Sequence, residues 1–178
     1  MLIPKHTQQG FTLIELMIAI TILGIVLALA LPSYQAFIQN TRLRNAAESI
    51  QNGLQIARAE AVKHNAQVRF SLGAGSSWTV GCVVGTADCP ALIQQRTTSE
   101  GSSASIIVTP TPTAGVEVIF NSFGAVAATA ATFTQLGIDV DTAVLSATDS
   151  RDLRITIGLG GNSRMCDPNL PTSDARAC

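Results

Sequence analysis

The chain carries four cysteines, Cys82, Cys89, Cys166 and Cys178, and none of them lies in the apolar run near its start. An even number of cysteines is typical of disulfides formed in an oxidising compartment. Because closing a short loop costs the least chain entropy, we predict the local pairs Cys82–Cys89 and Cys166–Cys178. Four reduced thiols or a zinc site are the alternatives, although zinc-binding cysteines usually lie about two to four residues apart.

Residues for catalysis are scarce. The two histidines, His6 and His64, are too few for a histidine-based metal centre, and they leave the serines without an evident general base. The Gly-rich segment 158–161 lacks the lysine of a phosphate-binding loop and predicts a hairpin turn instead. We therefore predict a protein that is not an enzyme, with no catalytic residue, no metal and no cofactor.

The net charge of the chain does not attract nucleic acid, because 11 Lys and Arg are balanced by 12 Asp and Glu. Arginines do gather near the end of the chain, at positions 151, 154, 164 and 176. The predicted Cys166–Cys178 loop would hold Arg176, with Arg164 at its base, as a patch able to contact phosphates. The alternative is that these arginines pair with the nearby aspartates at 152, 167 and 174.

The apolar run 11–31 decides the class of protein. It has 21 positions and one charged residue, and a helix of about 20 apolar residues crosses a bilayer. Lys5 and His6 precede the run, and the next cation is Arg42. The positive-inside rule therefore predicts a cytoplasmic start, with the rest of the chain on the other side of the membrane.

Glu15 is the charged residue of that run. A carboxylate inside a spanning helix costs on the order of 2.5–3.5 kcal/mol near the centre, and less near an end. Cleavage after Gly10 would keep the helix as an anchor and create an ammonium on Phe11. On a neighbouring copy, such an ammonium would neutralise Glu15 and set the register of packed helices. Alternatively, the carboxyl stays protonated or reaches the membrane surface.

The segment 10–16, GFTLIEL, resembles the processing site of type IV pilins and of the pseudopilins of type II secretion. The resemblance implies that a prepilin peptidase cuts after Gly10 and methylates Phe11. It also implies that Glu15 pairs with the terminus of a neighbouring subunit during assembly. Pro32 ends the apolar run, as in that family, and should kink the helix because proline removes a backbone donor.

Beyond Pro32 the helical pattern continues with an apolar stripe. Its members recur every three or four residues, at Leu43, Ala47, Ile50, Leu54, Ala57 and Ala61. We predict one helix over 11–62, whose outer part packs on a globular head.

After the helix the sequence becomes β-like, with turn-rich segments between short alternating runs. The strand candidates are 67–72, 77–84, 92–98, 105–109, 115–120, 131–135 and 153–157. Strands at this spacing favour an antiparallel β-sandwich. The predicted organisation is a leader (1–10), a membrane-spanning assembly helix (11–31), its amphipathic continuation (32–64) and a β-rich head with a disulfide-looped tail (65–178).

The head resembles the GspH/FimT group of minor pilins and pseudopilins. The segments that carry this are LQIARAEAV (54–62), WTV (78–80), FNSFG (120–124) and RITI (154–157). The resemblance implies the α+β type IV pilin fold, with a long helix on a sandwich-like antiparallel head.

Some FimT-type pilins of competent bacteria bind DNA through a C-terminal Gly-Arg-x-Arg motif. The matching positions here are Gly161, Asn162, Ser163 and Arg164, so Asn162 replaces an expected arginine. The candidate DNA-binding residues are thus Gly161, Asn162, Arg164 and Arg176.

From these features we predict a minor type IV pilin of FimT type. It would sit in the inner membrane by a single pass, with a cytoplasmic N terminus and a periplasmic head, and later in the pilus. Its expected partners are other major and minor pilins, the prepilin peptidase and double-stranded DNA. The alternative is a GspH-like minor pseudopilin of a type II secretion system.

Overall fold

The computed structural model describes residues 10–100 and 102–178. The leader residues 1–9, with Lys5 and His6, lie outside the described residues. Two compact units divide the chain, one up to Phe37 and one from Ile38 onward.

A single helix, α1 (Leu13–Lys63), contributes to both units. Its apolar part has a mean hydropathy of 2.7 over 18 residues and is long enough to cross a membrane. The helix predicted over 11–62 is therefore confirmed. Because the helix continues through position 32, the proline does not end it, and the kink expected at Pro32 stays a prediction.

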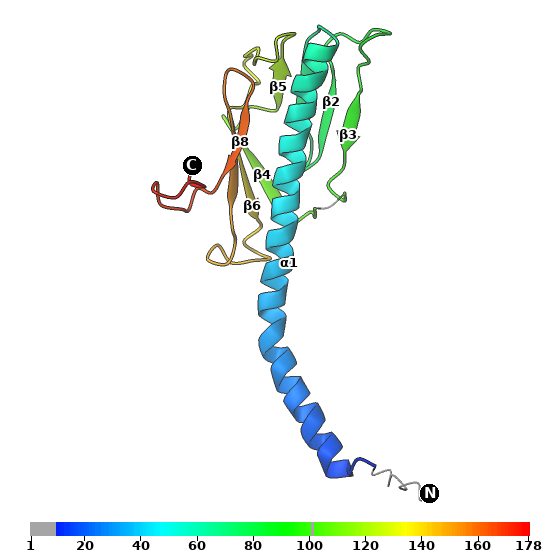
Figure 1. The fold of residues 1–178 in the computed structure, drawn as a ribbon, viewed down its shortest axis with the longest axis vertical. Helices are drawn as coiled ribbons and strands as arrows, with labels where there is room; N and C mark the ends of the chain where they lie inside the picture. Colours follow the sequence, from blue (N-terminus) through cyan, green and yellow to red (C-terminus); the bar gives the residue numbers. More distant parts are fainter. Residues whose placement is uncertain (1–9, 101) are drawn as a thin grey trace, which may run out of the picture. The chain divides into compact units, whose positions relative to one another are not determined.

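Two antiparallel four-stranded sheets form the head (Figure 1). The first has the order β3 (Gln94–Arg96), β2 (Trp78–Cys82), β1 (Val68–Leu72) and β5 (Glu117–Phe120). The second has the order β4 (Ile106–Thr111), β6 (Gln135–Val140), β7 (Leu153–Ile157) and β8 (Ser163–Cys166). The α+β pilin fold predicted from the sequence is confirmed.

Two details of the strand prediction were wrong. The segment 131–135 is not a strand of its own, because before Gln135 only isolated bridges join Val126 to Phe120 and Thr132 to Glu117, and the strand β6 covers Gln135–Val140. The strand β8 was missed, because its four residues carry little β pattern and take their shape from pairing with β7. In both places it is hydrogen bonding to a neighbouring strand, and not the local residue pattern, that decides where a strand forms.

The predicted apolar stripe of α1 is the buried face of the helix. Its six members, from Leu43 to Ala61, are 0–1% exposed. Beside this stripe Gly53 lets the helix approach the first sheet closely, since a Cβ there would lie 2.7 Å from Phe70 and 2.9 Å from Trp78. The indole Nε1 of Trp78 also donates a hydrogen bond of 2.9 Å to Ser49 Oγ on the helix. Helix and sheet are therefore in direct contact at this point.

Candidate processing segment and C-terminal loop

The start of α1 is capped by Thr12. The amide of Glu15 donates to Thr12 Oγ1 at 3.3 Å, and the amide of Leu16 donates to the Thr12 carbonyl at 3.2 Å. Thr12 is thus the N-cap, and Glu15 stands at the third helical position, the spacing of a capping box. A carboxylate in the first turn also lies favourably in the helix dipole. Thr12 was not predicted from the sequence as a cap, although the Thr-x-x-Glu spacing is a signal for it.

Gly10 and Phe11 lie before the helix and are exposed, Phe11 by 84%. A Cβ at Gly10 would meet no atom within 4 Å, so the fold itself does not require glycine there. The side chain of Glu15 has no hydrogen bond or ion pair within residues 10–100 and 102–178, and it is exposed. A single chain therefore leaves this carboxylate available to a second molecule.

The two predicted disulfides are both present. Cys82 pairs with Cys89 at a Cα–Cα distance of 5.8 Å, and Cys166 pairs with Cys178 at 5.0 Å. The prediction from loop length is confirmed, and the described cysteines are all oxidised. Across the described part of the chain, no group of three or more His, Cys, Asp or Glu side chains is arranged to hold a metal.

Arg164 acts inside the C-terminal loop. Its Nη2 donates to the carbonyls of Ala175 at 3.1 Å and Ala177 at 2.9 Å. The Asp167 amide donates to the Arg176 carbonyl at 2.8 Å, which ties the two arms of the loop together. Together with the Cys166–Cys178 disulfide, these bonds make Arg164 a positioning residue for the loop.

Arg176 extends from the same loop and pairs with an aspartate. Its side chain is 77% exposed, and Nη2 lies 2.9 Å from Asp174 Oδ2. Its backbone amide and Nε also donate to Asp174 Oδ1, at 2.9 and 3.2 Å. Hydrogen bonds from Arg176 lower the pKa of Asp174 to about 2. The pairing that the sequence analysis held as the alternative is formed at this arginine.

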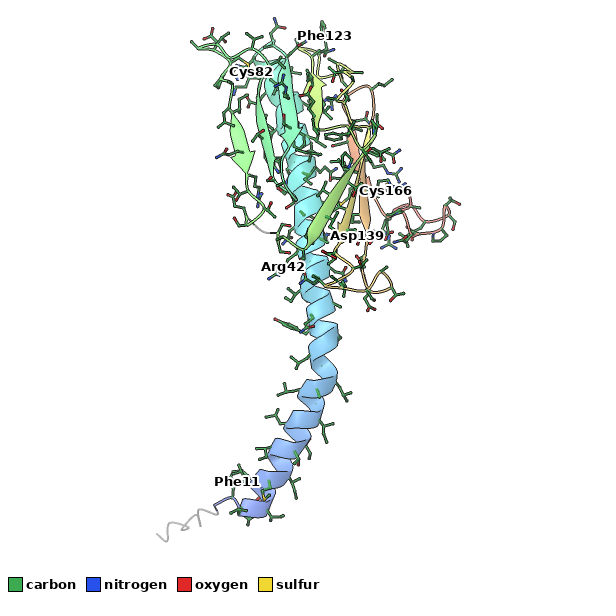
Figure 2. All side chains as sticks on the ribbon, turned by 180° about the vertical axis from the view of Figure 1, so that it is seen from behind. Phe11, Arg42, Cys82, Phe123, Asp139 and Cys166 are labelled. Carbon is green, nitrogen blue, oxygen red and sulfur yellow. A yellow bond between two sulfur atoms is a disulfide. The ribbon has the colours of Figure 1, made fainter. Side chains whose placement is uncertain are left out.

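Gly161 and Asn162 occupy a different place, the turn between β7 and β8. Gly161 has a φ of 79°, and a Cβ there would collide with the carbonyl oxygen of Gly124. The Asn162 carbonyl accepts a hydrogen bond of 2.9 Å from the Gly158 amide. In Figure 2 this end of the head is marked by Phe123, while Cys166 marks the base of the C-terminal loop. The structure therefore splits the four candidate DNA-binding residues between two sites.

A cleft of about 370 Å³, here named the tail cleft, lies between α1 and the C-terminal loop. Its lining combines apolar side chains with three arginines and comprises Asn40, Leu43, Arg44, Arg151, Leu153, Met165, Cys166, Asp167, Leu170, Ala175 and Arg176. The arginines at 151 and 176 stand out in the sequence, but their place beside Arg44 at one cleft was not predicted from it. Helix periodicity places Arg44 outside the buried stripe, but not beside the tail.

Comparison with known families gives two matches. The family model described as "Type II transport protein GspH" matches residues 46–161, and the "Prokaryotic N-terminal methylation motif" matches residues 5–31.

Curated relatives are similar at the start of the chain. Fimbrial protein EcpC of Eikenella corrodens is 52% identical over 42 residues, 24% of this chain and 28% of that protein. Type IV major fimbrial protein FimA of Dichelobacter nodosus is 45% identical over 56 residues, 32% of this chain and 34% of that protein. The chain spans about a third of the length of these relatives.

Among solved structures, the type IV minor pilin FimU of Pseudomonas aeruginosa is similar in fold. One crystal form has a TM-score of 0.53 at 16% identity, covering 78% of this chain and 95% of FimU. A second form has a TM-score of 0.50, covering 74% and 94%. At this identity the likeness concerns the fold alone.

Proposed function

Because the chain belongs to the GspH family of type II transport proteins, whose members are structural pilin-type subunits and not enzymes, we propose that it is a minor type IV pilin of FimT type. It would be held in the inner membrane by its apolar helix, with the head in the periplasm. After processing it would assemble into a type IV pilus or the complex that primes one.

The observation that carries this proposal is the start of the helix. Gly10 stands in open space, Thr12 caps the helix, and Glu15 is exposed without a partner in the described chain. Cleavage after Gly10 would free an ammonium on Phe11. Between neighbouring subunits, this ammonium and Glu15 would form an ion pair in an apolar environment, where an unpaired carboxylate is costly.

The test is Glu15→Ala in the full chain, compared with Glu15→Gln. We expect both variants to insert in the membrane and to be processed, because neither removes the apolar run or the residues around Gly10. Both should be lost from sheared pili, since neither can pair with an ammonium. Normal incorporation of either variant would refute the pairing role of Glu15.

A GspH-like minor pseudopilin is the second candidate, supported by the description of the matching family model. It uses the same helix chemistry but assembles in a type II secretion system. Deletion of the gene separates the two functions: loss of surface pili supports the pilin, and loss of secreted proteins with normal pili supports the pseudopilin.

Contact with double-stranded DNA during uptake is a further role of the proposed FimT-type subunit. The exposure of Arg176 supports it, while the Arg176–Asp174 pair and the bonds of Arg164 within the loop weaken it. Binding of the full chain to duplex DNA should then fall steeply as salt rises. It should also weaken in Arg176→Ala but not in Arg96→Ala, which removes an arginine outside the tail. Absence of binding at low salt would exclude this role.

A further inference from the structure

The tail cleft combines an apolar floor with a charged rim, in which three arginines stand with Asp167. Leu43 is buried at its base, and the half-buried side chains of Leu153, Met165 and Leu170 surround it. Concave sites with an apolar lining and a few convergent polar groups are the usual form of a binding site. The cleft therefore has the composition to take a segment that is both apolar and charged.

Arg151 gives the cleft its available positive charge. Arg44 pairs with Glu48 at 2.9 Å, and Arg176 pairs with Asp174. The exposed guanidinium of Arg151 has no ion pair among the described residues, and only its backbone amide is engaged, with Asn40 Oδ1 at 2.9 Å. A carboxylate brought by another molecule would find a cation here without first displacing an aspartate or glutamate.

The walls of the cleft are held in place before any partner arrives. The disulfide at Cys166 and the bonds from Arg164 hold the C-terminal loop on one side. On the other side Asn40 binds both the Asp149 carbonyl and the Arg151 amide, each at 2.9 Å. Preorganised walls reduce the entropy that binding must offset.

The same chain carries a segment with the complementary chemistry. No Lys, Arg or His occurs between Arg96 and Arg151, and the acidic residues of this stretch include Asp141. Asp141 opens the loop 141–149, here named the acidic loop, and it has no ion pair among the described residues. Its Oδ1 accepts from the Ala143 amide at 2.9 Å, and its carbonyl accepts from the Val144 amide at 2.8 Å, which fixes the turn. Val144, three residues on, is 51% exposed.

The acidic loop is poorly placed to enter the cleft of its own molecule. Its far end is bound at the Asp149 carbonyl to Asn40, which itself lines the cleft. Swinging the loop inward would break this bond and the turn at Asp141. A second molecule can instead present Asp141 and Val144 together.

We propose that the tail cleft receives the acidic loop of a second copy of this chain, with Asp141 against Arg151 and Val144 on the apolar floor. The contact pairs opposite charges over an apolar centre, which favours correct association and disfavours like-charged partners. This inference rests on the proposed function as an assembling subunit, and it names the head surface that such subunits would share.

The test uses the full chain in its own membrane, with the photoreactive residue p-benzoylphenylalanine replacing Val144. The matched control replaces Val116, which is 52% exposed and lies outside both the cleft and the acidic loop. We expect the Val144 probe to give a covalent dimer whose linked peptide contains Leu153, Met165 or Leu170. The Val116 probe should give no such product.

Charge reversal makes the test specific. Arg151→Glu or Asp141→Arg alone should reduce the dimer yield about tenfold, as expected for one like-charged pair, and the double variant should restore it. Disulfide mapping of each variant checks that the head has folded.

A Val144 product no stronger than the Val116 product, a link to a different protein, or yields insensitive to charge reversal would overturn the inference. Pilus incorporation measured in the same cells separates this failure from that of the proposed function. If incorporation is normal and the dimer is absent, only the inference fails. If the unaltered protein is not found in pili either, the proposed pilin function fails as well.

Discussion

Gly53 provides a quantitative test of how the helix and the first sheet fit together. In Gly53→Ala, the new methyl group would lie 2.7 Å from Phe70 and 2.9 Å from Trp78. Carbon atoms in contact normally lie about 3.5–4.0 Å apart, so one of the elements must move. Neither ring has room to give, since Phe70 is fully buried and Trp78 is 2% exposed. Trp78 is also bound to Ser49 and stacked on Phe70.

Two opposing effects decide whether Gly53→Ala raises or lowers the free energy of unfolding. Replacing a helical glycine by alanine favours the helix by about 1 kcal/mol. Overpacking a close-packed core costs about 1–3 kcal/mol, and the rigid aromatic pair places Gly53 at the upper end of that range. We therefore expect a net loss of about 2 kcal/mol in the free energy of unfolding, which lowers Tm by roughly 4–8 °C in a chain of this size.

Urea unfolding of the full chain in detergent measures this loss through the fluorescence of Trp78, the one tryptophan in the sequence. Gly24→Ala is the matched control, because a Cβ at Gly24 would meet no atom within 4 Å. The control should unfold at the same urea concentration as the unaltered protein or a higher one. A Gly53→Ala protein as stable as the Gly24→Ala control would refute the close contact between helix and sheet.

Two further predictions concern the ends of the chain. Gly10→Val should leave the head folded and the protein in the membrane but prevent processing, so mass spectrometry should find the leader retained. The control Gly24→Val, at another position where a Cβ meets no atom within 4 Å, should be processed normally. A methylated Phe11 terminus in Gly10→Val would contradict the cleavage site. The pKa of Asp174 is lowered to about 2 by Arg176. Because the folded pKa is depressed, the pair stabilises the loop above the ordinary pKa near 3.8 and loses this contribution as the pH falls toward 2. An NMR titration should show the Asp174 carboxyl changing near pH 2, and at a higher pH in Arg176→Ala, which removes the guanidinium but keeps the backbone amide that also donates to Asp174. Equal midpoints in the two proteins would contradict the ion pair.

The sequence alone predicted those features of this protein that depend on residues close together along the chain. The apolar run and the stripe from Leu43 to Ala61 predicted α1, because helix periodicity brings residues three and four apart onto one face. Short loops predicted both disulfides, because the cost of closing a loop depends on its length. The order Gly10, Phe11, Glu15 is likewise a property of a few adjacent residues.

Tertiary structure decided what those residues contact. β8 is a strand because β7 lies beside it, and Gly53 is required because Phe70 and Trp78 pack against the helix. Arg164 was a candidate for phosphate contact in the sequence, but the folded loop brings the carbonyls of Ala175 and Ala177 to its guanidinium. Such contacts join residues on different elements, and their distances follow from packing, which no local pattern records.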